Sequence, residues 1–115
     1  MKMSQMTTHI LDTTRGLPAQ NVPIALFAQQ DDDGQKVNGG VTNTDGRLPD
    51  LLADKETLPA GIYRMHFATA VYFKANNEVG FYPYVDIVFK IDASGTHYHI
   101  PLLLSAYGYS TYRGS

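Results

Sequence analysis

The sequence predicts an all-β fold with one short helix. Ten Gly, six Pro, eight Tyr and five Phe are spread through 115 residues as short apolar runs between turn residues. Residues 97–104 alternate so that every second side chain is apolar. Short alternating runs separated by turn residues are typical of a β-sandwich or β-barrel.

Each expected element follows from the local pattern. Residues 48–51 could add a short edge strand. The acidic run at 31–34 lies between apolar segments and predicts a hairpin loop. One short helix is expected over residues 70–77, because this segment lacks breakers and ends at an Asn pair before Gly80. The expected strands cover residues 7–12, 23–29, 36–42, 61–69, 84–91, 96–104 and 107–113.

Length and composition predict a single domain over residues 1–115. With 43% hydrophobic and 17% charged residues, the chain is too apolar to be intrinsically disordered. The net charge is -2 and Lys and Arg are scattered, which argues against nucleic acid as a partner. No apolar run approaches the ~20 residues that span a bilayer, so no membrane association is expected. The N-terminus lacks the apolar stretch of a secretory signal, and we expect a cytoplasmic protein.

The strand at 97–104 has two different faces, because side chains alternate along a strand. One face is apolar throughout and is expected in the core. The other is polar at one end and apolar at the other, whereas a solvated face would be more uniformly polar. We therefore expect another subunit to cover it. The apolar face carries Tyr98, Ile100, Leu102 and Leu104; the mixed face carries His97, His99, Pro101 and Leu103; the first strand repeats the pattern with Ile10 opposite His9 and Leu11.

Three histidines raise a zinc hypothesis. His97 and His99 point the same way on one strand, and His9 could join them from a neighbouring strand. No Cys and no nearby carboxylate completes four ligands, and a His-X-His on a strand is more often surface or interface chemistry. We therefore expect no metal, with a zinc-dependent amidohydrolase as an alternative.

Other catalytic motifs are missing from the sequence. There is no Gly-X-Ser-X-Gly elbow, phosphate-binding loop, dinucleotide fingerprint or Cys nucleophile, so neither covalent catalysis nor a bound cofactor is expected. The residues 44–47 fit a hairpin turn with Asp45-Gly46 at its tip, where Arg47 could be merely solvated. The remaining His and Arg residues suit activation of water, since imidazole can take a proton and guanidinium can hold negative charge.

Three segments together resemble one family. They are Thr-His-Ile-Leu-Asp-Thr-Thr-Arg-Gly-Leu-Pro-Ala at 8–19, Thr-Asp-Gly-Arg at 44–47, and His-Tyr-His-Ile-Pro-Leu-Leu-Leu-Ser at 97–105 running to Tyr-Arg-Gly-Ser at 112–115. They are similar to the 5-hydroxyisourate hydrolases, relatives of the hormone carrier transthyretin. The ending at 112–115 is specific to the enzymes, because the carrier branch lacks it.

The resemblance implies a transthyretin-like two-sheet sandwich of about eight strands with one short helix. It also implies a homotetramer, built as a dimer of dimers, with active sites in a channel between the dimers. The implied reaction is hydrolytic opening of the ring of 5-hydroxyisourate in urate breakdown, without metal or cofactor. The alternative is a carrier whose channel binds a small aromatic ligand without chemistry.

Carried over residue by residue, the family's site falls on both ends of the chain. His9, Arg47 and His99 are expected to be catalytic, and the resemblance adds Tyr112 and Ser115 to His9 and Arg47 as substrate contacts. We favour His9 as the base, but the roles of the two histidines stay open. Two further expectations concern their neighbours: His97 should be a rim residue, and Gly114 should let the chain turn tightly toward the site.

Overall fold

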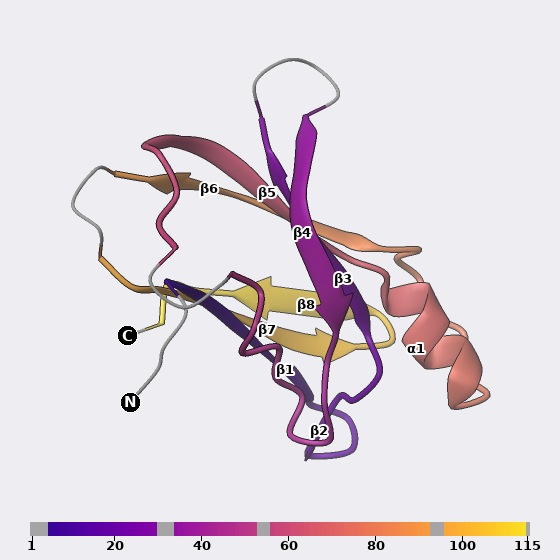
Figure 1. Ribbon diagram of the computed structural model, residues 1–115. Coiled ribbons are helices and arrows are strands. Elements are labelled where there is room, and N and C mark those ends of the chain that lie inside the picture. Colours follow the sequence, from indigo (N-terminus) through magenta and orange to yellow (C-terminus); the bar gives the residue numbers. More distant parts are fainter. Residues whose placement is uncertain (1–4, 30–33, 53–55, 93–95, 115) are drawn as a thin grey trace.

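Two four-stranded sheets face each other, and one helix lies at one end of the pair (Figure 1). The computed structural model describes residues 5–29, 34–52, 56–92 and 96–114. The elements are β1 Met6–Asp12, β2 Leu17–Pro18, β3 Pro23–Ala28, β4 Gln35–Val41, β5 Gly61–Phe67, α1 Thr69–Ala75, β6 Val85–Ile91, β7 Tyr98–Ser105 and β8 Gly108–Thr111. The strand orders are β2-β1-β7-β8 and β4-β3-β5-β6. The predicted β-sandwich with one helix is therefore confirmed.

The core fills the space between the two sheets. The predicted apolar face of β7 is confirmed, because Tyr98, Ile100, Leu102 and Leu104 are at most 5% exposed. Strand β1 alternates in the same sense, from buried Met6 to buried Asp12. Burial of each large apolar side chain contributes roughly 1.5–3 kcal/mol, so these two strands are firmly held at the centre of their sheet.

Strands β1 and β7 are the one parallel pair among the described strands. Their register places Thr7 opposite His99, His9 opposite Pro101, and Leu11 opposite Leu103. Residues from the two ends of the chain therefore share one central position in the sheet.

A buried carboxylate fixes the end of β1. Asp12 is 2% exposed and accepts a hydrogen bond of 2.6 Å from the Tyr72 hydroxyl of α1. It also accepts hydrogen bonds from the backbone N–H groups of Thr14 and Arg15. Burial and the bond to Asp12 raise the pKa of Tyr72 well above its usual value. This contact ties the strand that carries His9 to the helix.

Several predicted boundaries were wrong. Residues 48–51 form no strand; Pro49 has no N–H to donate, and Leu51 and Leu52 turn into the core instead. Thr69, expected at the end of a strand, is the first residue of α1. The two-residue strand β2 was not predicted, because a strand this short cannot show an alternating pattern of apolar and polar residues. The predicted hairpin loop at 31–34 lies mostly outside the described residues, although β3 and β4 pair antiparallel on either side of it.

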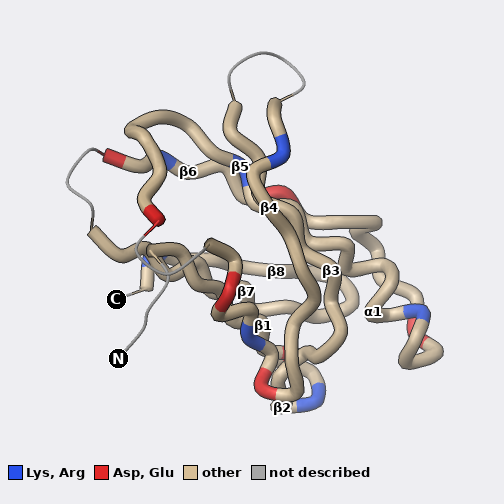
Figure 2. The backbone as a smooth tube through the Cα atoms, in the orientation of Figure 1, with Lys and Arg blue, Asp and Glu red and all other residues tan. Residues whose placement is uncertain are grey.

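Charged residues are scattered over both sheets and the connecting segments (Figure 2). In the part of the chain that the structure describes, Lys and Arg gather on no single face. No described helix has the length and apolar character needed to cross a membrane.

Candidate active site

The candidate site lies on the face of the β2-β1-β7-β8 sheet that points away from the core. We call this the outer face. It carries Thr7, His9 and Leu11 from β1, and His99, Pro101 and Leu103 from β7. His9 and His99 are half-buried diagonal neighbours, roughly 8 Å apart at their Cα atoms given normal strand spacing and rise. The parallel register thus brings together two histidines that are distant in sequence.

A turn after β4 brings Arg47 beside His9. The Asn43 side-chain oxygen accepts a hydrogen bond of 3.1 Å from the Arg47 backbone N–H, and the Asn43 backbone N–H donates to the Arg47 carbonyl. Gly46 has a φ of 72°, and a Cβ there would lie 2.5 Å from the Ile10 carbonyl oxygen. Only glycine fits this approach, which lets the Gly46 carbonyl accept a bond of 2.8 Å from the Ile10 N–H. The docked turn forms an antiparallel bridge between Arg47 and His9.

The C-terminal segment lies along β7 next to His99. The Gly114 N–H donates a hydrogen bond of 2.9 Å to the His99 carbonyl, and the two residues form a bridge. A Cβ on Gly114 would lie 2.6 Å from His99 Cδ2. Gly114 therefore packs closely against the imidazole, whereas the expected turn toward the site would involve Ser115, which lies outside the described residues.

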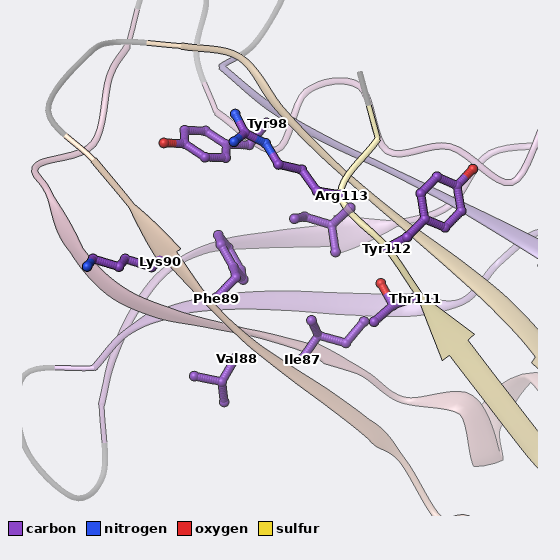
Figure 3. Close-up of a pocket in the computed structure, with 9 residues that line it drawn as sticks. Ile87, Val88, Phe89, Lys90, Tyr98, Thr111, Tyr112 and Arg113 are labelled. Carbon is purple, nitrogen blue, oxygen red and sulfur yellow. The ribbon is translucent and has the colours of Figure 1, made fainter.

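Residues 112 and 113 project to opposite sides of this segment. The Arg113 guanidinium lies 4.7 Å from the centre of the Tyr98 ring, on the core side of the sheet. Tyr112 points away from Phe89, as Figure 3 shows, and is 59% exposed. Alternation therefore assigns Tyr112 to the same outer face as His99. Ser115, the other expected substrate contact, lies outside the described residues.

The surroundings of the His9 imidazole lower its pKa. Burial is the largest cause that lowers the pKa of His9, followed by the positive charge of Arg47. A backbone hydrogen bond with Asp45 and the charge of its carboxylate act in the opposite direction. The net effect keeps His9 able to accept a proton at neutral pH.

The His99 imidazole has the same tendency. Burial again lowers the pKa most, and Arg47, His9 and His97 lower it further. A backbone hydrogen bond with Thr7 raises it. Arg47 lowers the pKa of both imidazoles and His9 lowers that of His99, so the three predicted catalytic residues form one electrostatic group.

Sequence reasoning missed Thr7. Its Oγ1 lies 2.8 Å from His99 Nδ1 and 3.1 Å from His97 Nε2, so one hydroxyl contacts both rings. The signal that was available is that residues 7 and 9 share a face of one strand. The alternation could not show that Thr7 pairs with His99, because His99 lies 92 residues further along the chain.

A cavity of about 310 Å³ lies elsewhere, between β6 and the end of β8 (Figure 3). Ile87 and Phe89 of β6 and Tyr98 and Ile100 of β7 contribute apolar surface to it. It is on the core side of the sheet, whereas His9 and His99 are on the outer side. Of the predicted site residues that the structure describes, Tyr112 lines the cavity and His9, Arg47 and His99 do not, so the cavity is separate from the histidine group.

The zinc alternative has no ligand group to support it among the described residues. No three of their His, Cys, Asp or Glu side chains are grouped so that they could hold a metal ion. Instead, a hydroxyl lies between the rings of His97 and His99. The imidazoles of His9 and His99 beside the Arg47 guanidinium can support proton transfer next to a positive charge.

Known proteins resemble this chain over nearly its whole length. Residues 6–114 match the HIUase/Transthyretin family. The 5-hydroxyisourate hydrolase of Mus musculus is 43% identical over 114 residues, covering 97% of this chain and 96% of that protein. The structure of Klebsiella pneumoniae 5-hydroxyisourate hydrolase matches with a TM-score of 0.84 at 34% identity, covering 96% of this chain and 98% of that one. Sea bream transthyretin, solved in complex with thyroxine, matches with a TM-score of 0.89 at 28% identity, covering 96% and 95%.

Proposed function

The chain belongs to the HIUase/Transthyretin family, and from this premise we propose that it hydrolyses 5-hydroxyisourate, an unstable product of urate oxidation. The observation that carries the proposal is the grouping of His9, Arg47 and His99 on one sheet face. We take residues 1–115 as one catalytic domain. The cytoplasmic location expected from the sequence stays a prediction.

The reaction makes three demands on these residues. The oxygen of water bonds to a ring carbonyl carbon and loses a proton, the carbonyl oxygen becomes negative, and the C–N bond breaks as the nitrogen gains a proton. One neutral imidazole takes the proton from water, and the other orients the reactants and assists the departing nitrogen. The Arg47 guanidinium offers a planar donor fork to the electron-rich ring and holds developing negative charge.

A direct assay tests the activity. Urate is oxidised in situ to 5-hydroxyisourate, and the ultraviolet decay of that compound is followed with and without the protein. Acceleration of the decay is the expected result. Decay at the uncatalysed rate would contradict the proposed function.

A carrier is the second candidate, because the similarity to sea bream transthyretin favours it. Both activities fit one sandwich, so the fold does not discriminate between them. Two neutral imidazoles beside a guanidinium supply proton-transfer chemistry that simple binding of an aromatic ligand does not require. The same assay separates the two, because a carrier would bind the compound and leave its rate of decay unchanged.

We also propose that the protein works as a homotetramer, a dimer of dimers with the outer face in the channel between them. Leu11 and Leu103 pair on this face next to the histidines, and Leu17 is 56% exposed nearby on β2. Strands β6 and β8 each end a sheet, so their edges are available for pairing with a second copy.

Leu103→Asp should dissociate the tetramer, because it buries an unpaired charge in the proposed contact. Light scattering of wild type and variant measures the change. Val79→Asp is the matched control, since Val79 is 85% exposed and lies beyond α1. A monomeric wild-type protein with full activity would rule out the shared channel.

The pH dependence of kcat/KM should reflect the lowered pKa values of His9 and His99. Catalysis needs a neutral imidazole, so activity should fall as pH decreases, with the midpoint below the ordinary histidine value of about 6.5. In Arg47→Gln the midpoint should move to higher pH, because a charge that disfavours the protonated rings is gone. The shift should be partial, since burial is the larger cause and remains.

Arg47→Lys is the control for this shift, because it keeps the positive charge. Its midpoint should stay close to that of the wild type even if turnover falls. A wild-type midpoint at or above 6.5, or an unchanged midpoint in Arg47→Gln, would contradict the assignment.

A further inference from the structure

A threonine hydroxyl connects two histidines at the edge of the candidate site. Thr7 Oγ1 is 2.8 Å from Nδ1 of His99 and 3.1 Å from Nε2 of His97. Thr7 of β1 pairs with His99 of β7, His97 immediately precedes β7, and all three residues are only partly exposed. The arrangement is a hydrogen-bonded chain of imidazole, hydroxyl and imidazole.

The chemistry of the groups restricts how hydrogen is distributed along this chain. A hydroxyl has one hydrogen to donate and can accept from a second group. It can therefore donate to only one of the two ring nitrogens. If Thr7 donates to His97 Nε2, it must receive its other bond from His99 Nδ1–H. The hydrogen of His99 is then on Nδ1, and the Nε2 of the same neutral ring carries a lone pair.

The base role of His99 distinguishes this arrangement from its reverse. In the reverse, the Thr7 hydroxyl would donate to His99 Nδ1, and the neutral ring would carry its hydrogen on Nε2 with no lone pair left there to accept a proton. The second ring nitrogen of a histidine is commonly set in this way by the partner of the first.

We propose that Thr7 and His97 are positioning residues that hold His99 in the Nδ1–H form, so that His99 Nε2 takes the proton from the attacking water. This inference rests on the proposed function, and it assigns to His99 the base role that the sequence favoured for His9. The proton leaves water for Nε2 as the water oxygen bonds to the ring carbonyl carbon. The resulting imidazolium keeps its Nδ1–H bond to Thr7 Oγ1.

The neighbouring charges fit this assignment. The charges of Arg47, His9 and His97 each lower the pKa of His99 and so disfavour its protonation before substrate arrives. These charges favour the neutral form of His99, which is the form that can act as a base. The Thr7 hydroxyl, by accepting from Nδ1–H, stabilises the charged ring once the proton has been transferred.

The decisive variant is Thr7→Val, which removes the hydroxyl and keeps a β-branched side chain on a central strand. We expect kcat to fall about 10- to 100-fold with little change in KM, as for the loss of an orienting partner. Thr7→Ser restores the hydroxyl and should rescue most of the loss. His97→Phe should lower kcat as well, and the double variant with Thr7→Val should be no worse than Thr7→Val alone.

Nitrogen-15 NMR of the histidine rings reads the arrangement without any substrate. Wild-type His99 should be neutral with its hydrogen on Nδ1, and Thr7→Val should shift it toward the Nε2–H form. A wild-type His99 in the Nε2–H form overturns the proposal, as does normal kcat in Thr7→Val. If the wild-type protein leaves the decay of 5-hydroxyisourate unchanged, the proposed function is wrong. The NMR measurement needs no substrate, so it still tests the hydrogen-bonded chain in that case.

Discussion

Replacing His9, Arg47 or His99 by alanine is expected to lower kcat/KM for 5-hydroxyisourate at least ~10²-fold, the usual cost of losing a positioned acid or base. The three residues act as one electrostatic group, since Arg47 lowers the pKa of both imidazoles. Combined replacements should therefore cost much less than the product of the single effects. Ultraviolet decay of the substrate measures each variant.

These losses should occur without unfolding, because all three side chains lie on the outer face or on a surface turn. His66→Ala is the matched control. His66 lies on the outward-facing side of the other sheet, where its Nδ1 is 2.7 Å from an Asp86 carboxylate oxygen. It should keep wild-type activity, and the same circular dichroism spectrum is expected for all four variants. A fully active His99→Ala variant would remove that residue from the site.

Removal of residues 112–115 is expected to abolish most activity, although the ends of small domains are usually dispensable. The segment bonds to the His99 backbone through Gly114 and presents Tyr112 on the outer face. An exposed tyrosine ring there offers substrate a stacking surface and a hydroxyl that donates and accepts. We expect an intact tetramer by light scattering with about 10²-fold lower kcat/KM. An intact tetramer with normal activity would show that these residues only pack.

A single added carbon tests the same contact more finely. In Gly114→Ala the new Cβ would be 2.6 Å from His99 Cδ2, so the ring or the segment must move and activity should fall about 10-fold or more. Gly108→Ala is its control, because the Cβ there would meet only Ser105 Oγ at 3.8 Å. Loss of activity in Gly114→Ala alone is the expected pattern. Equal activity in both variants would contradict a role for the contact at His99.

The sequence alone determined which residues share a face. Alternation places His99 with Leu103 and His9 with Leu11, because side chains on a strand repeat every two residues whatever the partner strand is. The same local rule predicted the core side of β7, which the burial of Ile100 and its neighbours confirms. The helix was predictable for a similar reason, since the Asn pair that ends it is local.

The resemblance to a known family then selected the candidate site residues. Composition and spacing left Arg47 as a possible solvated turn residue, and they left zinc open for the three histidines. The three segments that resemble the family supplied the combination of His9, Arg47 and His99, because no single local pattern links these residues.

The tertiary structure decided the contacts between segments that are distant in sequence. The parallel register of β1 and β7 places Thr7 against His99, and the docking of Gly46 on β1 brings Arg47 to His9. Such a register depends on which strands become neighbours when both sheets bury their apolar faces, and a shift by one residue would reverse every side chain. The period of a strand therefore fixes the face that a residue occupies, whereas its partner on that face is set by packing across the whole sandwich.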